Sequence, residues 1–332
     1  MREKVPYLID VLTSLTVRPR DAVVVTGFWR SGTTWMQQIL ASTFSSKRLF
    51  EPFYYEIDAY RNAVITEMKV DALESDFGNA YIPFFGESVL RHPKAYQYIK
   101  NTLTGCVRGS IPPHYEWTRG EWVRSVRDSR TEHFRRKVVT KFVRGQFAVP
   151  AIHKAFQVPV IHITRDPRAV FASLKRRDWR WLERVSLTSL LTTGNDGREN
   201  YVEPFRNYLE WIDQSGQFPH KFAAYWALTE RYMENNIEIN KGLYPIRYEA
   251  MVENGRETLG DIFDKLGSAM KSSTLEITGM NRASKTTQPS RRELSKKALL
   301  NSWKDEISSK ETESIKNVLL ELDMMHHIDQ IN

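Results

Sequence analysis

The chain is poor in cysteine. Cys106 is the single cysteine among 332 residues, so an intramolecular disulfide is excluded and a cysteine-based metal cluster has too few ligands. The fold therefore does not depend on an oxidising compartment.

Long apolar runs are also missing. No stretch approaches the ~18 consecutive apolar residues of a membrane-spanning helix. Residues 1–20 carry several charges and lack an apolar core of signal-peptide length. These absences predict a soluble protein without a transmembrane segment, in the cytoplasm if Met1 is the native start. A trimmed luminal fragment fits them equally.

Positive charge is in excess. The formal net charge is +8, and basic residues cluster at 135–137, 175–177 and 291–292. Such a balance favours an anionic partner, which can be nucleic acid, a membrane or a small molecule. Because acidic residues interrupt the basic ones and no nucleic-acid-binding module is recognisable, we expect an anionic small molecule and no nucleic acid.

Short apolar strands alternate with helical patterns along the chain. The predicted strands are Val23–Thr26, Lys137–Phe142, Val158–Thr164 and Tyr244–Tyr248. The predicted helices are Thr34–Thr43, Pro150–Phe156, Pro167–Arg176, Phe222–Asn236, Arg256–Leu266 and Lys310–Leu322. This alternation predicts an α/β fold whose central parallel sheet is flanked by helices on both faces.

We expect one domain over residues 1–332, because no linker, repeat or low-complexity tract is visible. Two segments, about 50–135 and 178–220, are rich in aromatic residues and only weakly periodic, which is typical of insertions that shape an acceptor cleft. Their tryptophans are Trp117, Trp122, Trp179 and Trp181. Each is either a core residue or a flat surface for a sugar or a phenol.

The segment 22–35 predicts a strand, a glycine-bounded loop and the start of a helix. Gly27, Gly32 and Thr34 stand where a nucleotide triphosphatase loop has its glycines and hydroxyl. Thr33 stands in the lysine position, and Arg30 lies inside the loop. Backbone N–H groups and a helix N-terminus can still hold an anion. The loop therefore predicts anion binding rather than ATP chemistry.

A second anion signature begins at Arg165, directly after a predicted strand. An arginine at the carboxyl end of a strand faces the crevice where open α/β sheets bind ligands. Asp166 caps the helix predicted from Pro167, and Ser173 and Arg177 lie two and three turns along it on nearly the same face. Three such donors suit a phosphate monoester. The alternative is a helix cap with a surface arginine.

The two motifs together resemble those of the sulfotransferases that use 3′-phosphoadenosine 5′-phosphosulfate (PAPS). Residues 30–35 resemble their 5′-phosphosulfate loop, and residues 165–173 resemble their 3′-phosphate signature. Residues 245–249 resemble the strand whose tyrosine lies by the adenosine, and residues 284–291 resemble a late loop over the nucleotide. The cofactor contacts implied by this resemblance are Arg30, Ser31, Gly32, Thr33, Thr34, Trp35, Arg165, Ser173, Arg177, Tyr248, Ser284, Ser290 and Arg291.

The resemblance implies a P-loop, nucleoside-triphosphate-hydrolase-like sulfotransferase fold, with PAPS as co-substrate and adenosine 3′,5′-bisphosphate as product. Arg30 in the loop, and Glu51-Pro52 after the first helix, resemble the carbohydrate and tyrosylprotein branches. This tilts the predicted acceptor towards a carbohydrate hydroxyl, on a small molecule or an oligosaccharide. A tyrosine, lipid or secondary-metabolite hydroxyl remains open, as does the oligomeric state.

Sulfuryl transfer builds charge on the bridging phosphate oxygen, and Arg30 is the residue expected to stabilise it. The reaction needs no metal, because cations can hold the leaving phosphate. Glu51 is the predicted general base, since residues 139–144 lack the histidine of the small-molecule branch. Lys141 is expected to bridge to the sulfate. The alternatives are a surface or capping Glu51 and a solvated Lys141.

Two other classes of protein stay open. A P-loop kinase would need a cation at position 33 and an acidic Mg²⁺ ligand, and neither stands out in the sequence. A non-catalytic anion-binding protein would keep the fold without needing Glu51.

Overall fold

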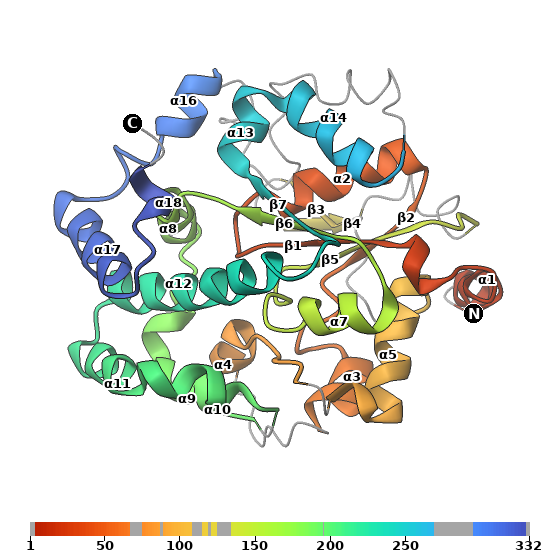
Figure 1. Ribbon diagram of the computed structural model, residues 1–332, viewed down its shortest axis with the longest axis horizontal. Coiled ribbons are helices and arrows are strands. Elements are labelled where there is room, and N and C mark those ends of the chain that lie inside the picture. Colours follow the sequence, from red (N-terminus) through yellow and green to blue (C-terminus); the bar gives the residue numbers. More distant parts are fainter. Residues whose placement is uncertain are drawn as a thin grey trace.

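The computed structural model describes residues 4–66, 75–86, 89–107, 115–118, 121–124, 134–194, 196–268 and 295–329. A five-stranded parallel sheet lies at its centre (Figure 1). The strand order is β2-β5-β1-β6-β7. The strands are β1 Val23–Thr26, β2 Lys47–Phe50, β5 Val138–Phe142, β6 Val160–Thr164 and β7 Leu243–Arg247.

The inner strands form where the sequence is apolar and β-branched. Every residue of β1, β5 and β6 is buried, as expected for a parallel sheet covered on both faces. All four predicted strands are confirmed to within two residues at each end. The strand β2 was not predicted, because this edge strand reads Lys-Arg-Leu-Phe and has no apolar or β-branched run. Its Lys47 ammonium lies 2.8 Å from a carboxylate oxygen of Asp10 in α1 (Lys4–Ser14).

Helices cover both faces of the sheet. One face carries α2 (Thr33–Phe44), α13 (Tyr248–Glu253) and α14 (Gly255–Lys265), with Val25, Ile163 and their neighbours in one buried cluster. The opposite face carries α5 (Pro93–Thr104), α7 (Val149–Phe156) and α12 (Phe218–Ile237) (Figure 1). The predicted α/β class, with its parallel sheet between helices, is therefore confirmed.

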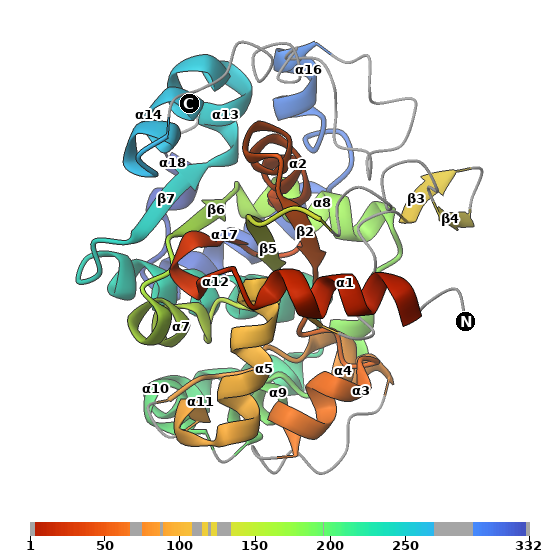
Figure 2. The same cartoon turned by 90° about the vertical axis from the view of Figure 1, so that its right-hand side faces the viewer.

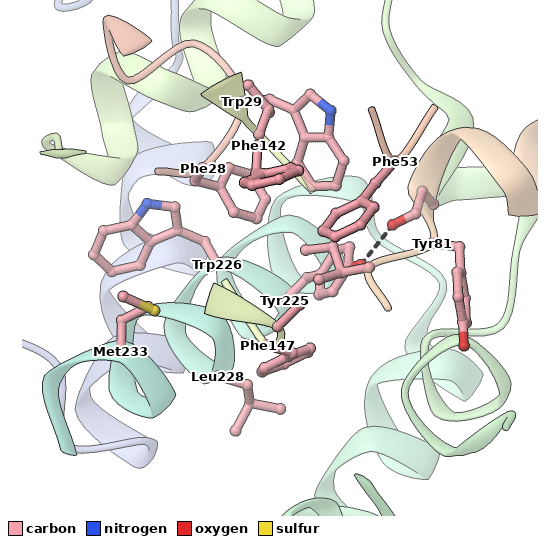
Figure 3. Close-up of a cluster of buried hydrophobic side chains, with 14 of the residues drawn as sticks. Phe28, Trp29, Phe53, Tyr81, Phe142, Phe147, Tyr225, Trp226, Leu228 and Met233 are labelled. Atoms are coloured by element: carbon pink, nitrogen blue, oxygen red, sulfur yellow. Dashed lines mark hydrogen bonds between the residues drawn. The ribbon is translucent and has the colours of Figure 1, made fainter. Parts of the chain in front are cut away.

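A large aromatic core lies under the second face (Figure 3). The Phe53 and Phe142 rings stack with centroids 4.5 Å apart, and Phe28 packs edge-on against Tyr225. The Tyr225 hydroxyl donates a hydrogen bond to the carbonyl of Ala80. This core anchors the loop after β1, because Phe28 is the second residue of that loop and is fully buried.

The remaining elements frame the sheet. In the first aromatic-rich segment they are α3 Asp58–Tyr60, a π-helical turn Arg61–Ile65, α4 Ser75–Ala80, the 3₁₀ turn Val89–Arg91 and the antiparallel hairpin β3 Tyr115–Thr118 with β4 Glu121–Arg124. In the second they are η4 Trp181–Arg184, α9 Leu187–Thr192, α10 Arg198–Val202, η5 Glu203–Phe205 and α11 Arg206–Ser215. The hairpin is set apart from the main sheet (Figure 2).

Two regular helices, α5 and α11, form in these segments although their sequence was expected to show only weak helical periodicity. Pro93 opens α5 and Gly105 ends it in the left-handed region, and Gly216 ends α11 in the same way. Of the helices in the described part of the chain, none is long and apolar enough to cross a membrane.

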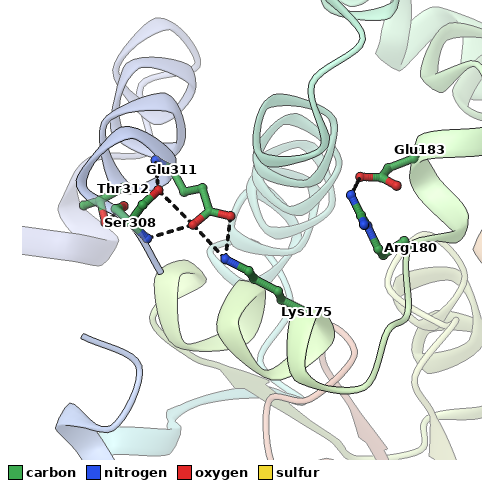
Figure 4. Close-up of polar contacts among 6 residues, drawn as sticks. All are labelled: Lys175, Arg180, Glu183, Ser308, Glu311 and Thr312. Atoms are coloured by element: carbon green, nitrogen blue, oxygen red, sulfur yellow. Dashed lines mark hydrogen bonds and ion pairs between the residues drawn. The ribbon is translucent and has the colours of Figure 1, made fainter. Parts of the chain in front are cut away.

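The C-terminal helices are α16 Lys296–Asn301, α17 Ser309–Glu321 and α18 His326–Asp329, and α17 packs against α8 (Pro167–Arg176). The Lys175 ammonium of α8 lies 2.8 and 2.9 Å from the two Glu311 oxygens, and Glu311 also accepts the backbone N–H of Ser308 in a capping box (Figure 4). This contact holds α17 against the helix of the second anion motif.

Candidate active site

All five strands are parallel, so their carboxyl ends meet at one edge of the sheet. The residues that follow the strands, in sheet order, are Glu51 after β2, Val143 and Arg144 after β5, the loop 27–32 after β1, Arg165 after β6 and Tyr248 after β7. Ligands of open α/β sheets bind at this edge. The predicted site residues therefore gather along one line, with the glycine loop at its middle.

The loop after β1 needs both of its glycines. A Cβ on Gly27, whose φ is 152°, would lie 2.2 Å from the carbonyl oxygen of Ile163. Gly32 precedes α2 with a φ of 95°, and a Cβ there would lie 2.6 Å from the Tyr248 ring. Glycine at 32 therefore lets the tyrosine after β7 pack directly on the loop.

The two anion motifs touch each other. Arg30 Nε donates a hydrogen bond to Ser173 Oγ at 3.0 Å. Arg165 Nη1 donates to the backbone carbonyl of Arg30 at 2.9 Å. Two motifs that the sequence analysis identified separately thus form one continuous surface. Asp166 caps α8 as predicted, because its carboxylate accepts the Arg168 N–H.

Aromatic rings line the β7 side of this surface. The Arg165 guanidinium lies 4.2 Å from the centroid of the Tyr248 ring, and Trp35 meets Tyr248 edge-on at 6.2 Å. The strand was predicted to end at Tyr248, but β7 ends one residue earlier and Tyr248 is the first residue of α13. Its ring lies against the loop at Gly32 and against the Arg165 guanidinium, and its contact with the adenosine stays a prediction.

Positive charge is concentrated around Arg30. Burial, with the like charges of Arg177, Arg165 and Arg176, lowers the pKa of Arg30 to about 9. Burial and Arg176 also lower the pKa of Arg177. Like charges so close together disfavour one another and favour an anion between them. Arg177 therefore adds positive charge near Arg30, and its contact with a phosphate stays a prediction.

Buried polar atoms at this edge are left unpaired. Ser31 Oγ, Thr164 Oγ1 and Arg165 Nε have no hydrogen-bond partner within the described residues. Buried donors normally have partners, and leaving one unpaired costs about 1–3 kcal/mol. A ligand with several acceptor oxygens would satisfy such donors, and an excess of cations selects an anionic one.

Lys141 lies on the β5 side of the loop. Its ammonium donates to Thr34 Oγ1 at 3.0 Å and lies 3.7 Å from Glu51 Oε1. Burial lowers the pKa of Lys141 to about 8, with Glu51 opposing the shift and Arg30 and Arg144 adding to it. The alternative of a solvated lysine is excluded by this burial.

Glu51 is buried and held in one orientation. Its backbone has a φ of 49°, and its N–H continues the β2–β5 ladder to the Lys141 carbonyl at 3.0 Å. Oε1 accepts the Val143 N–H at 2.8 Å, and Oε2 accepts from Arg144 Nη1 at 3.3 Å. The alternative of an exposed surface residue is therefore excluded, since Glu51 is only 4% exposed.

Arg144 is the residue that sequence reasoning missed. Besides Glu51 it faces two rings, with its guanidinium 5.5 Å from the Trp29 centroid and 5.2 Å from the Tyr54 centroid. The signal was present in the sequence, because Arg144 follows a buried strand by two residues just as Arg165 follows another by one.

The other predicted residues have mixed outcomes. Thr33 is buried at the first turn of α2. Trp181 belongs to the core, with its ring 5.0 Å from Trp29, whereas Trp179 is 36% exposed and lies 5.8 Å from the Arg30 guanidinium. Trp117 and Trp122 are cross-strand partners in the β3–β4 hairpin. Ser284, Ser290 and Arg291 lie outside the described residues.

A parallel sheet with a glycine-bounded anion loop between β1 and α2 defines a P-loop-like α/β protein. A family model described as the Sulfotransferase family matches residues 22–272, and the chain belongs to that family. The resemblance stated from the two anion motifs is therefore confirmed, and so is the P-loop-like sulfotransferase fold. No curated protein matches the chain.

Three solved sulfotransferase structures are similar to the chain at low identity. The sulfotransferase domain from the curacin biosynthetic pathway is 15% identical, with a TM-score of 0.42, covering 90% of this chain and 96% of that one. A mouse sulfotransferase complexed with PAP is 12% identical, with a TM-score of 0.44, covering 95% and 88%. A sulfotransferase from Mycobacterium avium is 13% identical, with a TM-score of 0.43, covering 97% and 80%.

Proposed function

We propose that this sulfotransferase transfers a sulfuryl group from PAPS to an acceptor hydroxyl, most readily one on a carbohydrate. The observation that carries the proposal is the hydrogen bond between Arg30 and Ser173, with Arg165 bonded to the Arg30 carbonyl. These contacts join the two anion motifs. A nucleotide with phosphate groups at both 5′ and 3′ positions matches two adjoining anion sites, whereas AMP matches one.

The proposed cofactor contacts form separate groups along the sheet edge, one for each part of the nucleotide. The amides of residues 31–34, with Arg30, hold the 5′-phosphosulfate at the start of α2. Arg165, Ser173 and Arg177 hold the 3′-phosphate, with charge-assisted hydrogen bonds from the arginines. Tyr248 and Trp35 flank the adenosine. Ser284, Ser290 and Arg291 remain predicted contacts of the same nucleotide.

Transfer proceeds in line, with the acceptor oxygen forming a bond to sulfur as the bond from sulfur to the bridging phosphate oxygen breaks. Arg30 stabilises the charge that builds on that bridging oxygen. Lys141, held by Thr34 beside the loop, provides a second cation for the sulfate oxygens. PAPS supplies the activated sulfuryl group, and no residue becomes covalently modified.

Glu51 accepts the proton of the acceptor hydroxyl. Its position after β2 brings the carboxylate to the loop from the side opposite Arg165. Arg144 and Lys141 hold the carboxylate in place, with N···O distances of 3.3 and 3.7 Å. The Val143 N–H donates to Oε1 and fixes the orientation of the carboxylate. The lone pairs that make no such contact therefore point in fixed directions.

Support for a carbohydrate acceptor comes from two aromatic rings near the site. Tyr54 is half-buried beside Arg144, and Trp179 is partly exposed beside Arg30. Such rings stack on sugars, and also on phenols. A tyrosine, lipid or secondary-metabolite hydroxyl is the alternative acceptor.

The test is a transfer assay without added metal. Radiolabelled PAPS is incubated with panels of sugars, tyrosyl peptides, phenols and long-chain alcohols, and labelled product is measured. Transfer to sugars above the other panels is expected. Transfer to another panel alone would correct the acceptor class, and hydrolysis or transfer that proceeds equally with Arg30→Ala would overturn the proposed mechanism.

A further inference from the structure

Three metal-ligating side chains converge away from the nucleotide edge. Glu234 lies near the end of α12, and His326 and His327 open α18. Glu234 Oε1 lies 3.0 Å from His326 Nε2 and 2.8 Å from His327 Nε2. One ligand atom from each residue lies within 4.8 Å of the other two. Two segments 92 residues apart thus bring two imidazoles and a carboxylate to one point.

One of these atoms is left without a hydrogen bond. His327 is 5% exposed, and its Nε2 has no hydrogen-bond partner among the described residues, although a carboxylate oxygen is 2.8 Å away. The ring is held edge-on against Trp226, with centroids 4.9 Å apart. A buried ring nitrogen without a hydrogen bond is unusual, and in the tautomer that leaves it unprotonated its electron pair is available to a metal ion.

We propose that Glu234, His326 and His327 bind a zinc ion. Two imidazoles and one carboxylate suit Zn²⁺, whereas Mg²⁺ and Ca²⁺ prefer sites made only of oxygen. Zinc bonds of about 2.0–2.1 Å in a tetrahedron separate neighbouring ligand atoms by about 3.3 Å. The observed separations of 2.8 and 3.0 Å need only a few tenths of an ångström of opening. The His326 side chain is 48% exposed, so water can supply a fourth ligand.

Hydrogen bonding within the cluster explains only part of the same geometry. His326 Nε2 is at hydrogen-bond distance from Glu234 Oε1, at 3.0 Å, but His327 Nε2 makes no hydrogen bond to that oxygen although it lies 2.8 Å away. A single divalent ion would take an electron pair from each of the three residues.

The ion has a structural role and takes no part in sulfuryl transfer. It ties α18 to α12, beside α17, which packs on α12 and α8. The carbonyl of His327 also accepts a hydrogen bond from Arg247 Nη2 at 3.3 Å, at the end of β7. Zinc therefore fastens the C-terminal segment that braces the helix of the 3′-phosphate motif.

Calorimetric titration of the chelator-treated full chain with zinc chloride tests the proposal. One tightly bound ion per chain is expected, with no comparable heat from magnesium chloride. His326→Ala, which removes an exposed ligand, should weaken zinc binding by about 100-fold or more. His92→Ala, which removes an exposed histidine before α5, is the matched control and should bind as the wild type does.

A second ligand variant is measured by thermal unfolding. Glu234→Gln is chosen rather than a change at the buried His327, because Glu234 is partly exposed and the variant is expected to fold. Zinc should raise the melting temperature of the wild type and of His92→Ala, and should not raise that of His326→Ala or Glu234→Gln. Equal zinc affinity in the wild type and His326→Ala would overturn the proposal, as would absence of stoichiometric binding to the wild type.

Discussion

Arg30 and Ser173 lie 143 residues apart in the sequence, and a hydrogen bond of 3.0 Å joins their side chains. The bond crosses from the loop after β1 to the helix after β6. These strands are neighbours in the sheet, so the pairing of β1 with β6 is what brings the two anion motifs together.

Replacing Arg165 with alanine should weaken binding of adenosine 3′,5′-bisphosphate by ~1–3 kcal/mol for each charged hydrogen bond lost. The guanidinium also packs on Tyr248, so the variant removes a contact on the aromatic side of the site. Calorimetry measures the affinity. Arg206→Ala, which removes a surface arginine paired with Glu203, is the control. Equal affinity in both variants would exclude Arg165 from the nucleotide site.

Glu51→Gln should lower kcat by about 10²–10⁴-fold, because the amide cannot take the acceptor proton. Affinity for adenosine 3′,5′-bisphosphate should stay nearly unchanged, since Glu51 is not among the predicted nucleotide contacts. Glu56→Gln, a change at an exposed neighbour, should leave kcat as it is. If Glu51→Gln turns over at the wild-type rate, another group is the base.

Nucleotide binding should weaken as the pH rises through the pKa of Lys141, about 8. The protonated lysine attracts the anionic nucleotide, and the nucleotide in turn raises that pKa, so binding takes up a proton. Because binding takes up a proton, the affinity falls as the pH rises above the pKa, by up to about tenfold per pH unit. Titrations in buffers of different ionisation enthalpy measure the proton uptake.

Lys141→Met should abolish most of this pH dependence, and Lys141→Arg should shift it upwards, because a guanidinium stays protonated. The pH profile of kcat separates two roles for this residue. A fall through about pH 8 fits a lysine that acts as a cation. A rise through the same range would instead identify a neutral lysine as the base.

Gly32→Ala should weaken nucleotide binding and destabilise the fold, because the new Cβ meets the Tyr248 ring at 2.6 Å. Gly216→Ala is a matched control with a positive φ of 65° and no described atom within 4 Å of the added Cβ. The control should lose only the ~1–2 kcal/mol of left-handed backbone strain. Equal nucleotide affinity in the two variants would mean that Tyr248 does not contribute to binding.

Much of the fold was predictable because the inner strands are wholly buried. Continuous β-branched runs marked β1, β5 and β6, and Pro167 after Asp166 marked the start of α8. The edge strand β2 was not predicted because its basic residues form contacts outside the sheet, as Lys47 does with Asp10. Whether such a segment forms a strand depends on tertiary contacts, which a local sequence pattern does not contain.

The site was predictable where loop geometry requires particular residues, as at Gly27 and Gly32. It was not predictable where packing decides the role. Arg144 gains its position from Glu51, Trp29 and Tyr54, which come from two other segments. Local sequence likewise did not distinguish Trp181, which is core, from Trp179, which lies beside Arg30.

The most direct test of a joined 5′ and 3′ phosphate site is calorimetric titration, without metal, with adenosine 3′,5′-bisphosphate, AMP and ATP. Tight binding of the bisphosphate, well above both other nucleotides and lost in Arg165→Ala, is the expected result. Preference for ATP, or binding of none of the three, would contradict the assignment of both anion motifs. A P-loop kinase or a non-catalytic anion-binding protein would then be the favoured class.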